Sequence, residues 1–143
     1  MVTVEFDSMG EAVRLALVAG EYVGGGLAVL LLDATDPRSE GYMAEWGVLT
    51  ANVPAAAEWC RGRGNIAIDA DVPAALLEAL EAAGAVRMTG RSAASGMARY
   101  PLATVAGYVL DGMGGLPETL EEALGSTVVV EYESGGDGGA FEA

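Results

Sequence analysis

Residues 13–33 read VRLALVAGEYVGGGLAVLLLD, and this stretch decides the fold. Its first half is compatible with two structures. A strand would place Val13, Leu15 and Leu17 on one face, whereas a helix would group Val13 with Ala16 and Leu17. The three consecutive glycines in the middle favour the strand, because such a run forms a tight turn between two paired strands. The second half is continuously apolar, which is typical of a strand covered on both faces.

Further strands are predicted on both sides of this hairpin. Residues 2–7 alternate between apolar and polar side chains, and residues 46–53 form a third strand segment that Pro54 ends. Ser8 is placed to cap a helical turn over residues 9–12. Strands that follow one another along the chain with short connections predict an antiparallel meander.

One helix with well-defined ends is predicted in the second half of the chain. It begins after Asp71, which is placed as its N-cap, and it ends at about Ala83, just before Gly84. Its apolar face is formed by Val72, Leu76, Leu77 and Leu80. Short strands are expected before and after this helix, at residues 65–68 and 85–88.

Three more elements are predicted towards the C-terminus. Residues 99–110 have the pattern of a strand with a break near Gly107. Residues 116–124 have the pattern of a second helix, with a proline at its start and a glycine after its end. Residues 127–133 alternate as a last strand.

These elements together predict an α+β fold, a mostly antiparallel sheet (meander) with two packed helices. The chain has 143 residues, of which 52% are hydrophobic, so it is long enough for one domain with a packed core. We expect that domain to span residues 1–133. Residues 134–143 are rich in glycine and acidic residues, and they are predicted to form a flexible tail.

The charge and the residue types exclude several classes of function. The chain has 21 acidic residues and seven Arg, with no Lys and no His, for a net charge of −14. Without His there is no Ser-His-Asp or Cys-His machinery, and the single Cys60 excludes an internal disulfide and a thiolate zinc cluster. The negative charge argues against direct binding of nucleic acid. No apolar run approaches the roughly 20 residues that span a bilayer, so we expect a protein of the host-cell cytoplasm.

Three small motifs each have a structural explanation that is simpler than a chemical one. The DGMGG run at 111–115 lies where phosphate loops occur, but it lacks the lysine of such loops. Asp69 and Asp71 could bind a hard cation such as Mg²⁺, but no third ligand is evident. Cys60 has no neighbouring general base that would activate it. We therefore predict no catalytic residue, no metal and no cofactor, so the chain is predicted not to be an enzyme.

The negative charge is concentrated at the two ends of the chain. Residues 1–60 carry nine acidic residues and two Arg, residues 61–100 carry four and five, and residues 101–143 carry eight and none. Averaged over the surface of a protein of this size, the charge is about five times less dense than on duplex DNA. A mimic of DNA would therefore require the acidic ends to meet on one face.

A partner-binding surface is predicted from acidic residues spaced along strands and one helix face. Two residues that are two apart on a strand lie about 6.8 Å apart, close to the roughly 7 Å between phosphates of one DNA strand. The predicted surface consists of Glu5, Asp7, Asp111, Glu118, Glu121, Glu122, Glu131 and Glu133. An ordinary solvated face is the alternative. The mid-chain Arg residues could pair with these acidic residues, with a partner subunit or with a phosphate; they are Arg61, Arg63, Arg87, Arg91 and Arg99.

Several short motifs resemble, in their order, an uncharacterised domain-of-unknown-function family of small proteins carried by plasmids, conjugative elements and phages. The motifs are Tyr22 with Gly26-Leu27-Ala28-Val29, Leu49-Thr50-x-Asn52-Val53-Pro54, Ile66-x-Ile68, Leu76 with Leu80 and Gly84, Thr89-Gly90-Arg91, and Ser95-Gly96. The resemblance covers roughly residues 13–103. It implies a mobile element as the source, and no functional residue is carried over from it.

Two hypotheses about function follow. The first is a non-enzymatic acidic inhibitor from a mobile element, a DNA mimic that occupies the basic DNA-binding surface of a host defence complex (anti-CRISPR or anti-restriction type). The alternative is a structural or accessory protein-protein interaction module of a plasmid or phage, which binds its partner through an apolar patch and has no DNA mimicry. In the first hypothesis the partner is a nucleic-acid-binding host complex. Neither hypothesis involves a membrane. The sequence does not decide whether the protein forms a homodimer.

Overall fold

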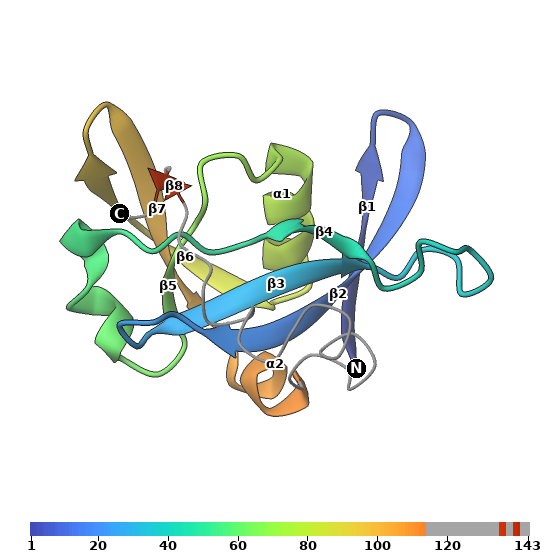
Figure 1. The fold of residues 1–143 in the computed structure, drawn as a ribbon, viewed down its shortest axis with the longest axis horizontal. Coiled ribbons are helices and arrows are strands. Elements are labelled where there is room, and N and C mark those ends of the chain that lie inside the picture. The colour runs from blue at the N-terminus through green and yellow to red at the C-terminus, as the bar shows by residue number, and fades with distance from the viewer. Residues whose placement is uncertain (114–134, 137–138, 141–143) are drawn as a thin grey trace.

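The computed structural model describes residues 1–113, 135–136 and 139–140, and its fold is α+β, as predicted. Four antiparallel strands form the first sheet, in the order β1-β2-β3-β4 (Figure 1). Their bounds are Val2–Ser8 for β1, Glu11–Glu21 for β2, Leu27–Asp33 for β3 and Glu45–Val48 for β4. This order confirms the meander, and β4 ends at Val48 rather than at Val53.

The central hairpin is the one that the sequence favours. The backbone N–H of Tyr22 donates to the carbonyl of Gly26 at 3.0 Å and closes the glycine turn between β2 and β3. Strand β3 is buried on both faces, because Leu31 enters the main core while Leu30 and Leu32 belong to a second apolar cluster. The continuous apolar run of β3 is therefore explained by burial on two sides.

The helical turn predicted after Ser8 is wrong. Strand β1 runs to Ser8, and the chain reverses in a two-residue turn in which Met9 has φ 54° and Gly10 has φ 91°. Asp7, not Ser8, caps this turn, because its Oδ1 accepts a hydrogen bond from the backbone N–H of Gly10 at 2.7 Å. Glycine relieves the backbone strain at one of the two positions, which is typical of a tight hairpin.

A second antiparallel sheet has the order β5-β7-β6. Its strands span Asn65–Ala67 for β5, Val86–Ser95 for β6 and Ala98–Val105 for β7. Strand β6 continues well beyond the predicted 85–88, because the chain forms a long hairpin with β7 that contains a register shift between Met88 and Ser92. The residues after β4 join the two sheets, since Thr50 bridges to Ile68 and the N–H of Asp69 donates to the carbonyl of Leu49 at 2.9 Å.

The two α-helices are short, and both differ from the elements that the sequence predicts. Helix α1 spans Ala74–Ala82 and helix α2 spans Gly107–Gly112. The N-cap of α1 is Pro73 with no side-chain hydrogen bond, so the prediction that Asp71 caps this helix is wrong. Helix α2 occupies the end of the predicted strand 99–110, and it begins at the glycine where a break was expected. Two 3-10 turns, η1 (Pro54–Ala56) and η2 (Trp59–Arg61), lie between β4 and β5.

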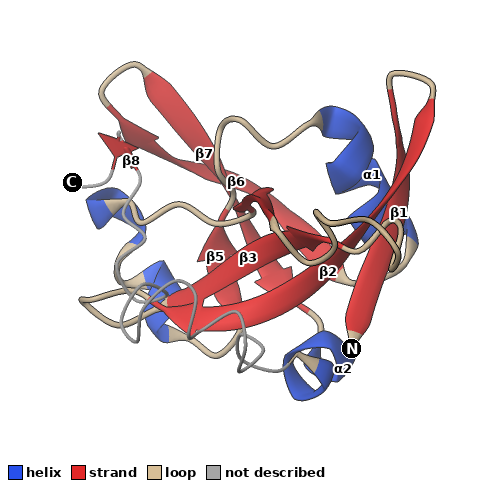
Figure 2. Ribbon diagram, turned by 45° about the vertical axis from the view of Figure 1, so that its right-hand side comes forward, coloured by secondary structure: helices blue, strands red, loops and turns tan. Residues whose placement is uncertain are grey.

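The core lies between the two sheets and is closed by α1. Leu76 and Leu80 of α1 are fully buried, as the apolar face of the predicted helix requires, and they belong to the same cluster as Phe6, Leu31 and Ile66. Helix α1 packs against β1 and β6 and so covers the open side between the two sheets (Figure 2). The main cluster unites both sheets and both helices, and two smaller apolar clusters lie outside it.

The predicted C-terminal elements lie mostly beyond the described part of the chain. The helix at 116–124 and the strand at 127–133 are outside the described residues, and the domain limit at 133 stays a prediction. Within the predicted tail, β8 (Gly135–Gly136) pairs with β9 (Gly139–Ala140). Among the described residues no helix has the length and the apolar character that crossing a bilayer requires.

Candidate partner-binding surface

Two of the predicted surface residues are neutralised by arginines. Glu5 lies opposite Arg14 in the β1–β2 register, and its Oε2 accepts a hydrogen bond from Arg14 Nε at 2.8 Å. Asp111, on α2, accepts a hydrogen bond from Arg63 Nη2 at 3.0 Å. Both pairs are exposed, so each contributes at most about 1 kcal/mol to stability, but each still reduces the local negative charge.

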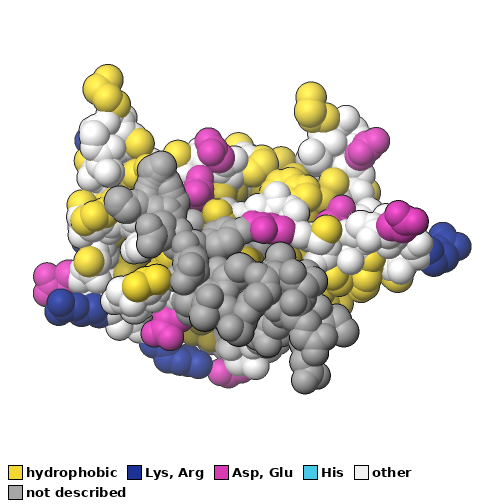
Figure 3. Space-filling model, in the orientation of Figure 1, with side chains coloured by type: hydrophobic (Ala, Val, Ile, Leu, Met, Phe, Trp, Pro, Cys, Tyr) yellow, Lys and Arg dark blue, Asp and Glu magenta, His cyan; other side chains and the backbone are white. Residues whose placement is uncertain are grey.

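The predicted acidic residues that the structure describes do not form one patch. Gly112, next to Asp111, lies against Val2 at the start of β1, whereas Asp7 lies five residues further along the same strand, about 17 Å away. The other five predicted residues, Glu118, Glu121, Glu122, Glu131 and Glu133, lie outside the described residues. Figure 3 shows the described acidic side chains scattered over the visible face rather than gathered on it. The described part of the chain therefore does not supply a DNA-like field by itself.

Two of the mid-chain arginines are also engaged within the protein. The guanidinium of Arg91 lies 5.0 Å from the centre of the Trp59 ring, a cation–π contact. Arg99 donates to the hydroxyl of Ser92 at 3.0 Å. Arg61 and Arg87 form no ion pair with any described residue, so they are the charged groups of this set that are open to a ligand or a partner.

A small cleft is lined by an aromatic residue and two acidic residues. It has a volume of about 310 Å³ and lies between β4 and the loop that leads into α1. Its lining residues are Leu31, Trp46, Gly47, Val48, Asp69, Asp71, Val72 and Pro73. Trp46 is 37% exposed, and its ring meets Phe6 edge-on with centroids 5.7 Å apart, which holds the indole at the edge of the core. We call this site the Trp46 cleft.

The carboxylates of the Trp46 cleft are not compensated by any described cation. Burial raises the pKa of the Asp69 carboxyl, and the nearby charge of Asp71 raises it further, while a hydrogen bond from the backbone N–H of Asp71 at 2.8 Å opposes this. Burial also raises the pKa of Glu45, which precedes Trp46 on β4. Among the described residues no group of three His, Cys, Asp or Glu side chains is placed to hold a metal ion. Two carboxylates beside an aromatic ring suit an organic cation.

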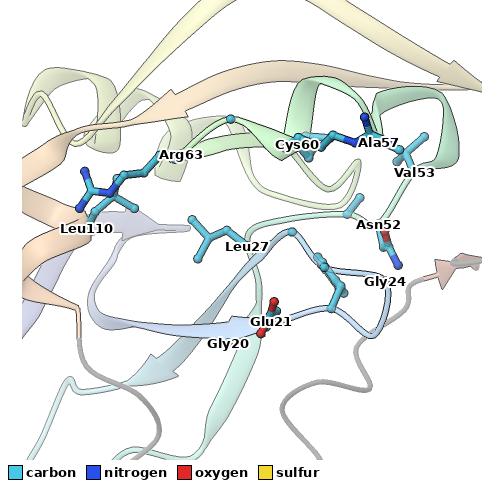
Figure 4. A pocket seen from close by; sticks show the side chains of 18 residues that line it. Gly20, Glu21, Gly24, Leu27, Asn52, Val53, Ala57, Cys60, Arg63 and Leu110 are labelled. Atoms are coloured by element: carbon cyan, nitrogen blue, oxygen red, sulfur yellow. The ribbon is translucent and has the colours of Figure 1, made fainter.

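A second and larger cavity lies at the other end of β3. It has a volume of about 760 Å³, and Figure 4 shows the glycine turn on one side and the turn containing Cys60 on the other. Burial raises the pKa of the Cys60 thiol, and a backbone hydrogen bond with Ala67 only partly opposes it. A thiol with a raised pKa is largely protonated at neutral pH, so Cys60 has the properties of a wall residue rather than of a nucleophile. The sequence shows Cys60 and its arginine neighbours, but it contains no local signal for the cavity, which depends on the distant glycine turn.

The glycine-rich motif at 111–115 has a structural explanation in its described part. Asp111 and Gly112 form the end of α2, and the N–H of Met113 donates to the carbonyl of Val109 at 2.8 Å to close it. Asp111 also pairs with Arg63, so the described part of this motif is explained by a helix end and an ion pair.

Comparison with protein-family models, with curated proteins and with solved structures gives no match to this chain. The resemblance to a family of mobile elements is therefore still a prediction.

Proposed function

We propose that this protein is a non-enzymatic acidic binding protein that docks onto a basic surface of another protein, with the Trp46 cleft receiving an Arg or Lys side chain. The Trp46 cleft carries this proposal, because it combines a partly exposed indole with Asp69 and Asp71, which have no cationic partner among the described residues. A cation over an indole contributes about 0.5–1 kcal/mol at an exposed site and more where water is excluded.

The net charge of the described residues is consistent with attraction of a basic partner at longer range. The described residues 1–113 carry 14 acidic residues and seven Arg, a net charge of −7, and three of those Arg form ion pairs with acidic residues. Such a field accelerates the approach of a basic partner and weakens as salt is added. The Trp46 cleft makes the specific contact with the partner, and the net negative charge attracts the basic partner towards the protein.

The cleft can be tested with a defined cationic probe. The probe is an arginine-rich peptide, and its control is the same peptide with citrulline at each arginine, which keeps the shape and removes the charge. We expect calorimetry to detect binding of the arginine peptide only, and we expect affinity to fall as salt is raised. Asp69→Asn combined with Asp71→Asn should weaken binding at least about threefold. The matched control is Glu78→Gln with Glu81→Gln, which changes the net charge equally on the exposed face of α1. Equal binding of both peptides, or equal loss in both double variants, would contradict the proposal.

Inhibition of a nucleic-acid-targeting defence complex by DNA mimicry is the second candidate function. The observation that favours it is the distribution of charge beyond the described core, since residues 114–143 carry seven acidic residues and no basic one. Because Glu5 and Asp111 pair with arginines and Asp7 lies apart from them, the mimicry depends on this segment.

The test of DNA mimicry is a charge reversal in an assay of DNA cleavage by a CRISPR effector or a restriction enzyme. Glu118, Glu121 and Glu122 are changed together to Arg, and the control changes Glu40, Glu78 and Glu81, which are exposed and give the same shift in net charge. We expect the first variant to lose inhibition and the control to retain it. Unchanged inhibition, or equal loss in both variants, would reject that surface.

A further inference from the structure

The larger cavity is lined by residues from several separate parts of the chain. One wall is the end of β2 with the glycine turn, and the opposite wall is the segment from residue 57 to residue 64. The two walls approach each other at Gly26, where an added Cβ would lie 4.0 Å from the Cβ of Cys60. Leu110 of α2 closes one end (Figure 4). The volume of about 760 Å³ lies within the range of small-molecule sites.

The lining of this cavity is apolar inside and charged at its edge. Its apolar lining residues are Leu27, Ala51, Val53, Ala57, Ala67 and Leu110. In the view of Figure 4, Arg63 and Leu110 stand at one end, Asn52 and Val53 stand at the other, and Leu27 lies between them. A ligand that fills this cavity therefore has an apolar body and polar groups at its margin.

The charges of the lining favour an anionic group on the ligand. Arg61 and Arg63 both come from the wall around Cys60, and Arg61 forms no ion pair with a described residue. Arg63 pairs with Asp111, but the two side chains are 69% and 76% exposed, so this ion pair is weak enough to exchange for a ligand. Glu21 lies on the opposite wall and repels an anion there, which directs the anionic group to the two arginines.

We propose that this cavity binds a small amphiphilic anion, a molecule with an apolar body and one carboxylate, sulfonate or phosphate group that contacts Arg61 and Arg63. The site is separate from the Trp46 cleft, so it does not depend on the proposed docking function. The anion forms charge-assisted hydrogen bonds with the guanidinium groups while its apolar body lies between Leu27 and the wall that contains Cys60.

Two fluorescent probes that share one ring system test this proposal. Anilinonaphthalene sulfonate carries the anilinonaphthalene ring with a sulfonate, and N-phenylnaphthylamine carries the same ring without charge. We expect Arg61→Ala to weaken binding of the sulfonate about tenfold and to change binding of the neutral probe less than twofold. Arg87→Ala removes an exposed arginine from β6 and serves as the matched control, with no effect on either probe. Equal effects of Arg61→Ala on both probes would overturn the anionic assignment.

Blocking the cavity tests its location. Gly24 has open space around its Cβ position and a φ outside the left-handed region, so Gly24→Trp can fill the mouth without backbone strain. We expect it to abolish binding of both probes, and Ala57→Trp, on the facing wall, serves as a second blocking variant if the first is poorly folded. Cys60 is the only cysteine of the chain, so we expect a saturating sulfonate probe to protect its thiol from N-ethylmaleimide. Unchanged binding in folded blocked variants, or unprotected Cys60 at saturation, would overturn the site.

Discussion

Replacement of Gly64 by alanine should destabilise the protein by about 2–4 kcal/mol. Gly64 has φ 79°, where a residue with a side chain loses about 1–2 kcal/mol. An added Cβ would also lie 2.9 Å from Leu110 Cδ1 and 3.0 Å from the carbonyl oxygen of Val105, and such overpacking costs about 1–3 kcal/mol. The reduced entropy of the unfolded chain offsets about 0.4–1 kcal/mol of this loss.

Two glycines of the turn between β2 and β3, Gly24 and Gly25, allow the backbone strain and the steric contact at Gly64 to be measured separately. Gly25 has φ 92° but no atom within 4 Å of the Cβ position, so Gly25→Ala should cost about 0.5–1 kcal/mol through backbone strain alone. Gly24 has neither the positive φ nor a close neighbour, so Gly24→Ala should stabilise the protein by about 0.4–1 kcal/mol. The three variants thus isolate the unfolded-state entropy, the strain and the steric contact.

The measurement is urea unfolding followed by tryptophan fluorescence, with the denaturant dependence compared among the variants. We expect the same slope in all of them and midpoints in the order Gly24→Ala, wild type, Gly25→Ala and Gly64→Ala, from most to least stable. If Gly64→Ala costs no more than Gly25→Ala, Gly64 does not approach Val105 and Leu110 as described. Gly64 and Leu110 would then not meet at the wall of the larger cavity.

Three other substitutions give sharp expectations about the core and its titratable groups. Leu80→Ala should lower the free energy of unfolding by about 2–5 kcal/mol in the same urea assay, because Leu80 is fully buried between the sheets. Because the pKa of Asp69 is raised, the folded state still binds a proton at a pH where the unfolded state has lost it. The stability of the protein therefore falls as pH rises through that range. Asp69→Asn should remove this fall, which a series of Tm measurements at different pH values would detect. Burial raises the pKa of Tyr22, so stability should also fall above about pH 10, where the unfolded tyrosine ionises. Tyr22→Phe should remove that alkaline loss and cost about 1 kcal/mol at neutral pH, since the hydrogen bond with Thr50 at 2.8 Å is lost.

The strands of the first sheet were predictable because burial imposes the period of the side chains. Residues of β1 alternate between buried and exposed, and the continuous run of β3 reflects burial on both faces. The helix at Ala74–Ala82 was predictable for the same reason, since Leu76 and Leu80 are one turn apart and both enter the core.

The errors arose where a local rule competed with tertiary contacts. A serine before a short polar segment is typical of an N-cap, but pairing of β1 with β2 requires a tight turn at Met9 and Gly10. Asp71 was a reasonable cap by its type, yet its own N–H bonds to Asp69 and the helix starts after Pro73. In both cases the longer-range contact determined the backbone conformation.

The Trp46 cleft could not be predicted because Trp46 and Asp69 are 23 positions apart in the sequence and belong to different elements. Asp69 and Asp71 were identified as a pair, but nothing in the sequence relates them to Trp46. Their meeting depends on the crossing between the sheets, where Thr50 bridges to Ile68 and Asp69 bonds to Leu49. Such non-local pairing follows from the packed core and not from any local pattern.

The ion pairs change the local charge around acidic residues in a way that the net charge does not show. Glu5 is one of the acidic residues that suggested a DNA-like surface, yet it lies opposite Arg14 in the sheet register and is neutralised there. Asp69 and Asp71 belong to the near-neutral middle of the chain, yet no described cation pairs with them. A partner responds to the local field, which falls within about 8–10 Å in physiological salt. A charge count along the chain therefore directs attention to the termini, whereas the presence of Asp69 and Asp71 in one cleft with Trp46 directs it to the Trp46 cleft.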